Sequence, residues 1–159
     1  DLKNIRRGDT MESNEMVLEF DSKSSNEGFA RISVTAFAAQ LDPTLDEIAD
    51  IKTAVSEAVT NSIIHGYEEK KGKIRIECKI EGDEFYITVI DWGCGIEDIQ
   101  KAREPLYTTK PELERSGMGF VFMEVFMDSL EIISQKEKGT TVKMRKKIEN
   151  TNKKNGKPM

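Results

Sequence analysis

The chain has 159 residues and a net charge of -5, and 37% of its residues are hydrophobic and 33% charged, a composition typical of a globular protein with one compact domain. The acidic balance argues against a surface that binds long stretches of nucleic acid, and no run approaches the roughly 18 apolar residues of a membrane span. Two cysteines and one histidine are too few for a zinc site or a disulfide framework, so we expect a protein of the reducing cytoplasm.

The two ends of the chain lack the periodicity of its middle. Residues 1–10 precede Met11, which reads as a natural start, and we expect them to be a disordered, vector-derived extension. Residues 148–159 are predicted to be a basic, flexible tail, with a nucleic-acid-binding tail as the less favoured interpretation. The predicted domain covers residues 11–147.

The first half of this domain predicts one strand and two helices. Residues 15–20 alternate apolar and polar side chains as a strand does. Residues 24–41 follow as a helix with Ser, Asn and Glu as capping groups at its head. Its apolar residues repeat at near-helical spacing: Phe29, Ile32, Phe37 and Leu41. After Asp42-Pro43, Thr44 and Glu47 form a capping-box pattern for a long second helix that ends at Gly66.

The second half predicts mostly strands. Residues 73–91 form two strands around a Gly82-Asp83 turn, and Cys78 falls on their apolar face as a packing residue. A short helix, an irregular stretch, an apolar helix over 119–127 and two closing strands follow. The order of elements predicts an α+β fold with helices on one face of a mixed, mainly antiparallel sheet.

Three polar constellations stand out against this background, and the first lies on the second helix. Glu57, Asn61 and His65 are spaced four apart and form a stripe beside the predicted core face. A solvated polar face explains the stripe as well. An acid and an amide one turn apart can also place a base and a magnesium ligand beside an acceptor hydroxyl.

The second constellation is the segment DWGCGIED, residues 91–98, at the end of a hydrophobic strand. Asp91 can accept a hydrogen bond from an exocyclic amine, and Gly93 and Gly95 allow a sharp bend and the close approach of a flat ligand. An ordinary turn with bystander glycines is the alternative.

The third constellation is RSGMGF, residues 115–120, at the start of the apolar helix. Its glycines expose backbone N–H groups at a helix N-terminus, which attracts phosphate, and nearby Lys110 and Arg115 can add positive charge. A glycine-rich helix start without a ligand remains the alternative.

Together, and in this order, the three constellations resemble the N, G1 and G2 boxes of the GHKL ATPase and kinase superfamily. The segments FARISVTAFAAQLDPTLDEIADIKTAVSEAVTNSIIHGY, PLYTTKPELERSGMGF and KGTTVKM are similar to the anti-sigma-F family of endospore-forming bacteria, whose members are serine kinases. The resemblance implies a two-layer α/β sandwich of the Bergerat type.

The resemblance also implies roles for single residues. Glu57 is the expected base, Asn61 the Mg2+ ligand, and Asp91 the adenine reader, while for His65 a structural, a phosphate-edge and a catalytic role stay open. Arg31 is an expected partner contact, and Trp92 is expected beside the adenine. The expected ATP or ADP contacts are Asn61, His65, Asp91, Gly93, Gly95, Thr108, Lys110, Arg115, Ser116, Gly117, Met118, Gly119 and Thr141.

The implied function is inhibition of a sigma-F-type sporulation sigma factor, together with phosphorylation of a serine in an anti-anti-sigma protein. A homodimer is implied, without direct contact to nucleic acid or membrane. A general-stress anti-sigma kinase and a nucleotide-gated sigma-binding module without useful kinase activity remain the alternatives.

Overall fold

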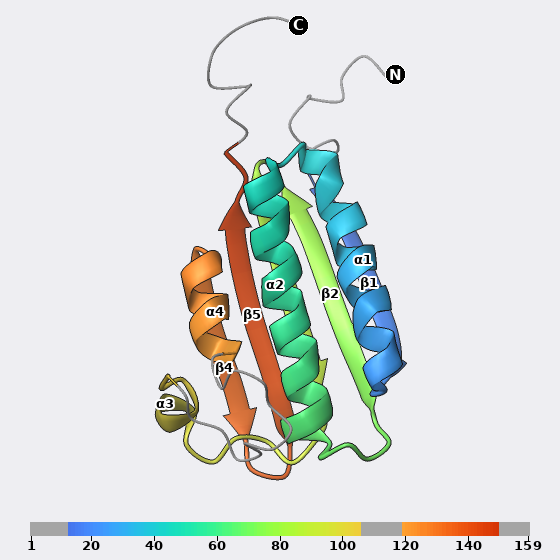
Figure 1. Ribbon diagram of the computed structural model, residues 1–159, viewed down its shortest axis with the longest axis vertical. Helices are drawn as coiled ribbons and strands as arrows, with labels where there is room; N and C mark the ends of the chain where they lie inside the picture. Colours follow the sequence, from blue (N-terminus) through green and yellow to red (C-terminus); the bar gives the residue numbers. More distant parts are fainter. Residues whose placement is uncertain (1–12, 106–118, 150–159) are drawn as a thin grey trace, which may run out of the picture.

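The computed structural model describes residues 13–105 and 119–149, in which one five-stranded sheet carries helices on one of its faces (Figure 1). The strands are β1 Ser13–Asp21, β2 Lys73–Glu81, β3 Glu84–Asp91, β4 Ser129–Gln135 and β5 Gly139–Lys147. Their spatial order is β1-β2-β3-β5-β4, and every pairing is antiparallel. The expected α+β arrangement is confirmed, and the described sheet is antiparallel throughout rather than mixed.

The helices α1, α2 and α4 lie side by side on this face, with α2 packed between the other two (Figure 1). The helical elements are the 3-10 turn η2 Ser24–Asn26, α1 Glu27–Ala38, the 3-10 turn η3 Ala39–Leu41, α2 Leu45–Asn61, the π-helical turn η4 Ser62–Gly66, α3 Ile99–Ala102 and α4 Gly119–Phe126. Among the residues that the structure describes, we find no helix with the length and apolar character needed to cross a membrane.

The capping box predicted for α2 is present. The Thr44 side chain accepts a hydrogen bond from the Glu47 N–H at 3.1 Å, and Glu47 Oε1 accepts one from the Thr44 N–H at 2.9 Å. The second carboxylate oxygen of Glu47 accepts the Glu149 N–H at 2.8 Å. The start of α2 therefore also fastens the chain beyond β5, and Ile148, which the sequence placed in the tail, packs in the core.

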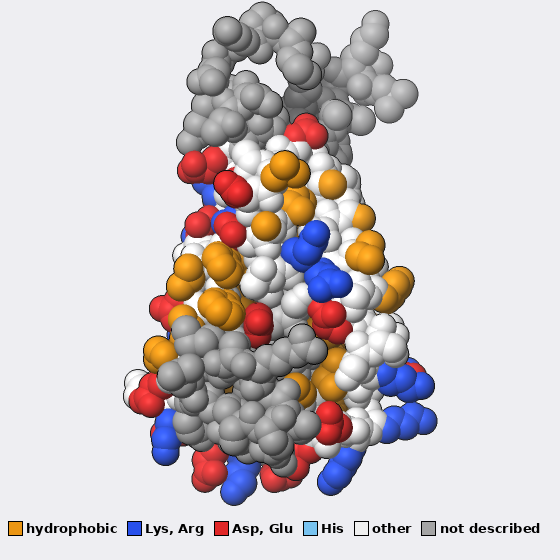
Figure 2. Space-filling view, viewed as in Figure 1, with side chains coloured by type: hydrophobic (Ala, Val, Ile, Leu, Met, Phe, Trp, Pro, Cys, Tyr) orange, Lys and Arg blue, Asp and Glu red, His pale blue; other side chains and the backbone are white. Residues whose placement is uncertain are grey.

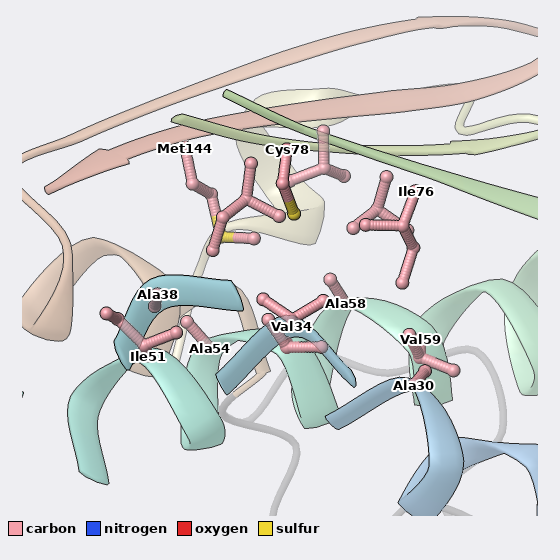
Figure 3. Packing of buried hydrophobic residues seen from close by; sticks show 14 of the residues in the cluster. Ala30, Val34, Ala38, Ile51, Ala54, Ala58, Val59, Ile76, Cys78 and Met144 are labelled. Carbon is pink, nitrogen blue, oxygen red and sulfur yellow. The ribbon is translucent and has the colours of Figure 1, made fainter. Parts of the chain in front are cut away.

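The core lies between the helices and the sheet, and its helix side is built largely from small residues (Figure 3). On α1 the buried side chains are Ala30, Val34, Thr35 and Ala38, whereas Phe29 and Ile32 are 55% and 66% exposed. Orange hydrophobic side chains are visible on the surface of this face of the molecule (Figure 2). The predicted apolar face of α1 was therefore wrong for Phe29 and Ile32, because α1 packs on its neighbours through its small side chains.

The start of α1 also differs from the prediction. Asn26 is its N-cap residue but makes no side-chain capping hydrogen bond, because its amide donates to the Asp21 carbonyl at 2.9 Å. Cys78 is 1% exposed in β2, as predicted for a packing residue, and burial raises the pKa of its thiol to about 12.

A buried lysine ties the elements that carry the site to one another. Lys146 of β5 lies 3.3 Å from the Asp50 carboxylate of α2 and donates a hydrogen bond of 2.7 Å to the Phe126 carbonyl at the end of α4. The positive charge of Lys146 also interacts favourably with the negative, C-terminal end of the α4 dipole. The C-terminal end of α4 is thereby tied to α2, against which α4 packs.

Candidate functional site

A cavity of about 980 Å³ opens at the end of the sheet where α2 and β3 both terminate. Its walls come from the end of α2, from η4, from the segment after β3, from the start of α4 and from the β4–β5 hairpin. Five residues predicted from the sequence line it: Asn61, His65, Asp91, Gly95 and Gly119. Residues from all three constellations thus line one cavity, as expected if the three constellations form a single site.

Asp91 is the buried carboxylate of the cavity, with 4% exposure. Its Oδ2 accepts a hydrogen bond of 2.9 Å from the Ser62 hydroxyl, and its Oδ1 accepts one of 3.0 Å from the Gly93 N–H. Burial raises the pKa of this carboxyl, and the hydrogen bonds oppose the shift only in part. Asp91 is therefore a fixed acceptor on the cavity wall, suited to a neutral N–H donor such as an exocyclic amine.

The glycines after Asp91 have a clear structural reason. A Cβ on Gly93 would lie 2.0 Å from the Gly66 carbonyl oxygen, and Gly95 has a φ of +75° with space for no Cβ beside Gln135. Gly95 lines the cavity, and Gly93 instead packs against the backbone of Gly66 at the end of η4. The bend predicted at these glycines is present, and the close approach at Gly93 is to the protein's own backbone.

The side chains of Glu57 and Asn61 both lie against the first residue of α4. A Cβ on Gly119 would be 3.2 Å from Glu57 Oε2, 3.1 Å from Asn61 Nδ2 and 3.2 Å from Asn61 Oδ1. An acid, an amide oxygen and the positive end of a helix are thus gathered in one corner beside the cavity, whose lining includes Asn61 and Gly119 but not Glu57. This corner suits a phosphate group with its counter-ion.

The donor set of this corner fits magnesium better than a transition metal. No three His, Cys, Asp or Glu side chains come together as a metal site within residues 13–105 and 119–149. Mg2+ is commonly held by one or two oxygen side chains together with substrate phosphates and water. Asn61 Oδ1 fits the part of such a single protein ligand.

His65 lies in η4 and lines the cavity. Its carbonyl oxygen accepts a hydrogen bond from the Cys94 thiol, with the sulfur 3.0 Å away. Burial raises the pKa of that thiol. The backbone of His65 thus helps to hold the segment after β3, while the role of its imidazole stays a prediction.

Two residues expected at the adenine end do not line the described cavity. Thr141 does not line the cavity, and its neighbour Thr140 does, because Thr140 pairs directly with Asp91 across β3 and β5 and shares its face of the sheet. Trp92 is 54% exposed and lies with Thr141 along a second, shallow depression that Asp91 and Thr140 also line. Since side chains alternate along a strand, Thr141 lies one residue out of phase with the cavity wall, and the adenine contacts of Thr141 and Trp92 stay predictions.

Three further residues of the site were not singled out from the sequence. Ser62 was assigned to the core face of α2, yet its hydroxyl binds Asp91. Thr140 and Ser134 line the cavity and share a hydrogen bond of 2.8 Å between their hydroxyl groups. The signal for Thr140 was its register opposite Asp91, which requires the strand pairing to be known.

Several expected contacts are not described by the structure. Thr108, Lys110, Arg115, Ser116, Gly117 and Met118 lie outside the described residues. Arg31 is described on α1, where its guanidinium lies 3.6 Å from the Glu27 carboxylate and is partly exposed, away from the cavity lining. Its expected role as a partner contact stays a prediction.

Comparisons with known proteins agree with this geometry. The sequence matches the histidine kinase-like ATPase domain over residues 22–146. It is 66% identical to an anti-sigma F factor of Clostridium perfringens over 136 residues, which cover 85% of this chain and 97% of that relative. It is 64% identical to an anti-sigma F factor of Clostridium kluyveri, with coverage of 86% and 96%.

Solved structures show the same fold at low sequence identity. The RsbU and RsbW domains of a Mycobacterium tuberculosis protein superpose with a TM-score of 0.60 at 20% identity, covering 85% of this chain and 32% of that one. The histidine kinase domain of a blue-light activated kinase from Erythrobacter litoralis gives 0.54 at 16% identity, covering 80% and 63%.

Proposed function

Because the chain belongs to the histidine kinase-like ATPase family, and within it to the anti-sigma F factors, we propose that it is an ATP-dependent serine kinase that also inhibits a sporulation sigma factor. The family binds ATP, and the described cavity offers it a buried acceptor at one side and a helix N-terminus at the other. The observation that carries the proposal is that Asp91 and Asn61 line one cavity, while Glu57 lies with Asn61 against Gly119 of the same cavity, although Glu57 and Asp91 are 34 positions apart in the sequence.

The adenine is expected to lie at the Asp91 side of the cavity. Asp91 accepts a hydrogen bond from the exocyclic amine, while hydrogen bonds from the Ser62 hydroxyl and the Gly93 N–H hold the Asp91 carboxylate in place. Thr140 lies beside Asp91 on β5 and takes the place that the sequence suggested for Thr141. A carboxylate at this position favours adenine over a base with an oxygen there, since two acceptors would then face each other.

The phosphates are expected at the corner formed by Glu57, Asn61 and Gly119. Bound Mg2+ would neutralise the charge on the transferred phosphate, with Asn61 as its protein ligand. The N–H groups at the start of α4 bind phosphate oxygens, and Glu57 takes the proton of the attacking serine. His65 lies at the edge of this region, and we keep Thr108, Lys110, Arg115, Ser116, Gly117 and Met118 as proposed phosphate or lid contacts.

The proposed partners are a sigma factor and a small antagonist. Relatives with 64–66% identity are named anti-sigma F factors, which supports a sigma factor of the sigma-F type as the inhibited partner. We place the phosphorylated serine on an anti-anti-sigma protein, propose a cytoplasmic homodimer as the working form, and assign Arg31 to the partner surface. Phosphorylation of the antagonist would weaken its competition for the kinase.

A transfer assay separates this function from a binding module without kinase activity. The chain is incubated with γ-labelled ATP, Mg2+ and an anti-anti-sigma protein, with a serine-to-alanine antagonist as control. We expect label on the intact antagonist alone. Nucleotide-dependent capture of the sigma factor without any transfer would overturn the kinase and favour the binding module.

A competition between sigma factors separates a sporulation kinase from a general-stress one. Sigma factors of both types are offered to the chain in equal amounts together with ATP. We expect preferential capture of the sporulation type, and a preference for the stress type would reassign the partner without changing the chemistry.

A further inference from the structure

Three successive backbone N–H groups follow Asp91, and each has a defined acceptor. The Trp92 N–H donates to the Tyr67 hydroxyl at 2.8 Å, the Gly93 N–H to Asp91 Oδ1 at 3.0 Å, and the Cys94 N–H to the Gly66 carbonyl at 2.8 Å. Two of these three acceptors belong to the residues that end and follow η4. The segment after β3 is therefore held from the N-box side as well as from its own strand.

Tyr67 is itself held firmly. Its own N–H donates to the Ser62 carbonyl at 2.9 Å, and its hydroxyl donates to the Lys73 carbonyl while accepting from Trp92. The phenol ring packs against the core and lies so close to Gly72 that a Cβ there would be 2.3 Å from it. The hydroxyl is thus a fixed bridge between the start of β2 and the end of β3.

The Tyr67 hydroxyl acts on the peptide that joins Asp91 to Trp92. The Trp92 N–H and the Asp91 carbonyl belong to one planar unit, so a bond to this N–H restricts the backbone of Asp91. Tyr67 does not line the cavity; its backbone N–H binds the Ser62 carbonyl, and the described hydrogen bond from the site to its side chain is the one from this peptide. An effect of the Tyr67 hydroxyl on a bound nucleotide is therefore expected to pass through Asp91 and the turn after it.

We propose that Tyr67 is a positioning residue for the nucleotide, whose hydroxyl fixes the peptide after Asp91 and so orients the carboxylate that accepts the adenine amine. The inference rests on the proposed function, because it needs ATP as the ligand of the cavity. It concerns the adenine end alone, since the phosphate corner at Glu57, Asn61 and Gly119 shares no described hydrogen bond with Tyr67.

The test compares Tyr67→Phe with Tyr86→Phe. The first change keeps the ring that packs against Gly72 and removes only the hydroxyl. Tyr86 lies in β3 on the sheet face away from the helices, so its variant is a matched control for loss of a phenol hydroxyl. For Tyr67→Phe we expect the dissociation constant and the KM for ATP to rise about 3- to 10-fold, with kcat changed less than about twofold. Tyr86→Phe should match the wild type in all three.

Amide exchange at Trp92 reports on the hydrogen bond independently of activity. We expect faster exchange of this amide in Tyr67→Phe and unchanged exchange in Tyr86→Phe, while both variants keep the exchange pattern of the core strands. Two results for Tyr67→Phe would overturn this inference and leave the proposed function standing. One is a fall in kcat as large as the rise in KM, and the other is an unchanged ATP affinity although the Trp92 amide exchanges freely. Absence of ATP binding to the wild type would instead overturn the proposed function and this inference with it.

Discussion

At the scale of single residues, Asp91 shows how a binding site costs stability. Its carboxyl is buried, and its folded-state pKa is raised above the ordinary value of 3.8 by that burial. Between these two pKa values the folded chain binds more protons than the unfolded chain, so the free energy of unfolding falls as the pH rises through this window. Above the raised pKa the buried charge therefore lowers the free energy of unfolding by its full amount.

Asp91→Asn is expected to raise the melting temperature near pH 7 while weakening ATP binding about 10- to 100-fold, because a hydrogen bond to a charged acceptor is lost. The thermal advantage should shrink as the pH falls through the raised pKa and vanish below about 3.8. Calorimetric unfolding of both proteins between pH 3 and 8, with ATP titrations near pH 7, checks this. A variant that melts lower than the wild type at pH 7 would show that the hydrogen bonds outweigh the burial.

Glu57→Gln is expected to keep ATP affinity within about twofold and to lower the rate of transfer by about 100- to 10,000-fold, since it removes a general base and keeps the shape. Single-turnover transfer of labelled phosphate to the antagonist measures the rate, and a parallel titration measures the affinity. Turnover equal to the wild type would remove Glu57 from the chemistry and leave only a structural contact with Gly119.

The residue roles were predictable to different degrees. Glu57, Asn61 and Asp91 could be placed from spacing and resemblance because helical periodicity and the end of a strand are visible in the sequence. Thr140 and Ser62 could not, since their roles depend on the register of β5 against β3 and on the packing of η4 against the sheet. A shift of one residue along a strand moves a side chain to the other face, and this explains why Thr140, and not Thr141, lines the cavity.

At the scale of elements, α2 carries the site because both of its ends are well defined. It begins with the capping box of Thr44 and Glu47 and ends in the π-helical turn η4. The wider turn accompanies the contact between Ser62 and Asp91, and π-type turns are frequent at functional sites. The start of α2 could be predicted from the sequence. The change from α-helix to π-helix at its end could not, because it does not alter the spacing of the apolar residues.

Thr44→Ala is expected to lower the free energy of unfolding by about 0.5–2 kcal/mol, because the N–H of Glu47 loses its capping acceptor. Thr53→Ala, in the interior of the same helix, is the control and should be neutral or slightly stabilising, since Ala is the better helix former. Urea unfolding of both variants measures the difference. Equal stability of the two would mean that the capping box contributes nothing beyond what solvent supplies.

The face of α1 was harder to predict than its existence. The spacing of Phe29 and Ile32 suggested a buried stripe, but the close approach of α1 to the core selects Ala30, Val34 and Ala38. The sequence of α1 carries apolar residues on more than one side of the helix. The sequence pattern predicts that a helix forms, but the packing decides which side is buried.

At the scale of the whole molecule, the fold separates two surfaces. The cavity lies at one end of the sheet, while α1 presents Phe29 and Ile32 to solvent on either side of Arg31 in the sequence. Exposed apolar residues beside an arginine are typical of protein interfaces. The proposed inhibitor and kinase functions can therefore use different parts of one small domain.

Arg31→Ala is expected to weaken binding of the sigma factor about 10-fold or more and to leave ATP affinity unchanged, because Arg31 lies outside the cavity lining. Arg75→Ala, on the open face of the sheet, is the control. Titration of the sigma factor into each variant in the presence of Mg-ATP measures the effect. Equal sigma affinity in the two variants would remove Arg31 from the partner surface.

The central claim is that one magnesium-dependent ATP site lies between Asp91 and the corner of Asn61 and Glu57. The most direct measurement is a calorimetric titration of ATP into the wild type and into Asn61→Ala, each with Mg2+ and with excess chelator. We predict one site per chain in the wild type, strongly weakened both by the chelator and by the substitution. Unchanged Mg-ATP affinity in Asn61→Ala, or no binding to the wild type, would contradict the account.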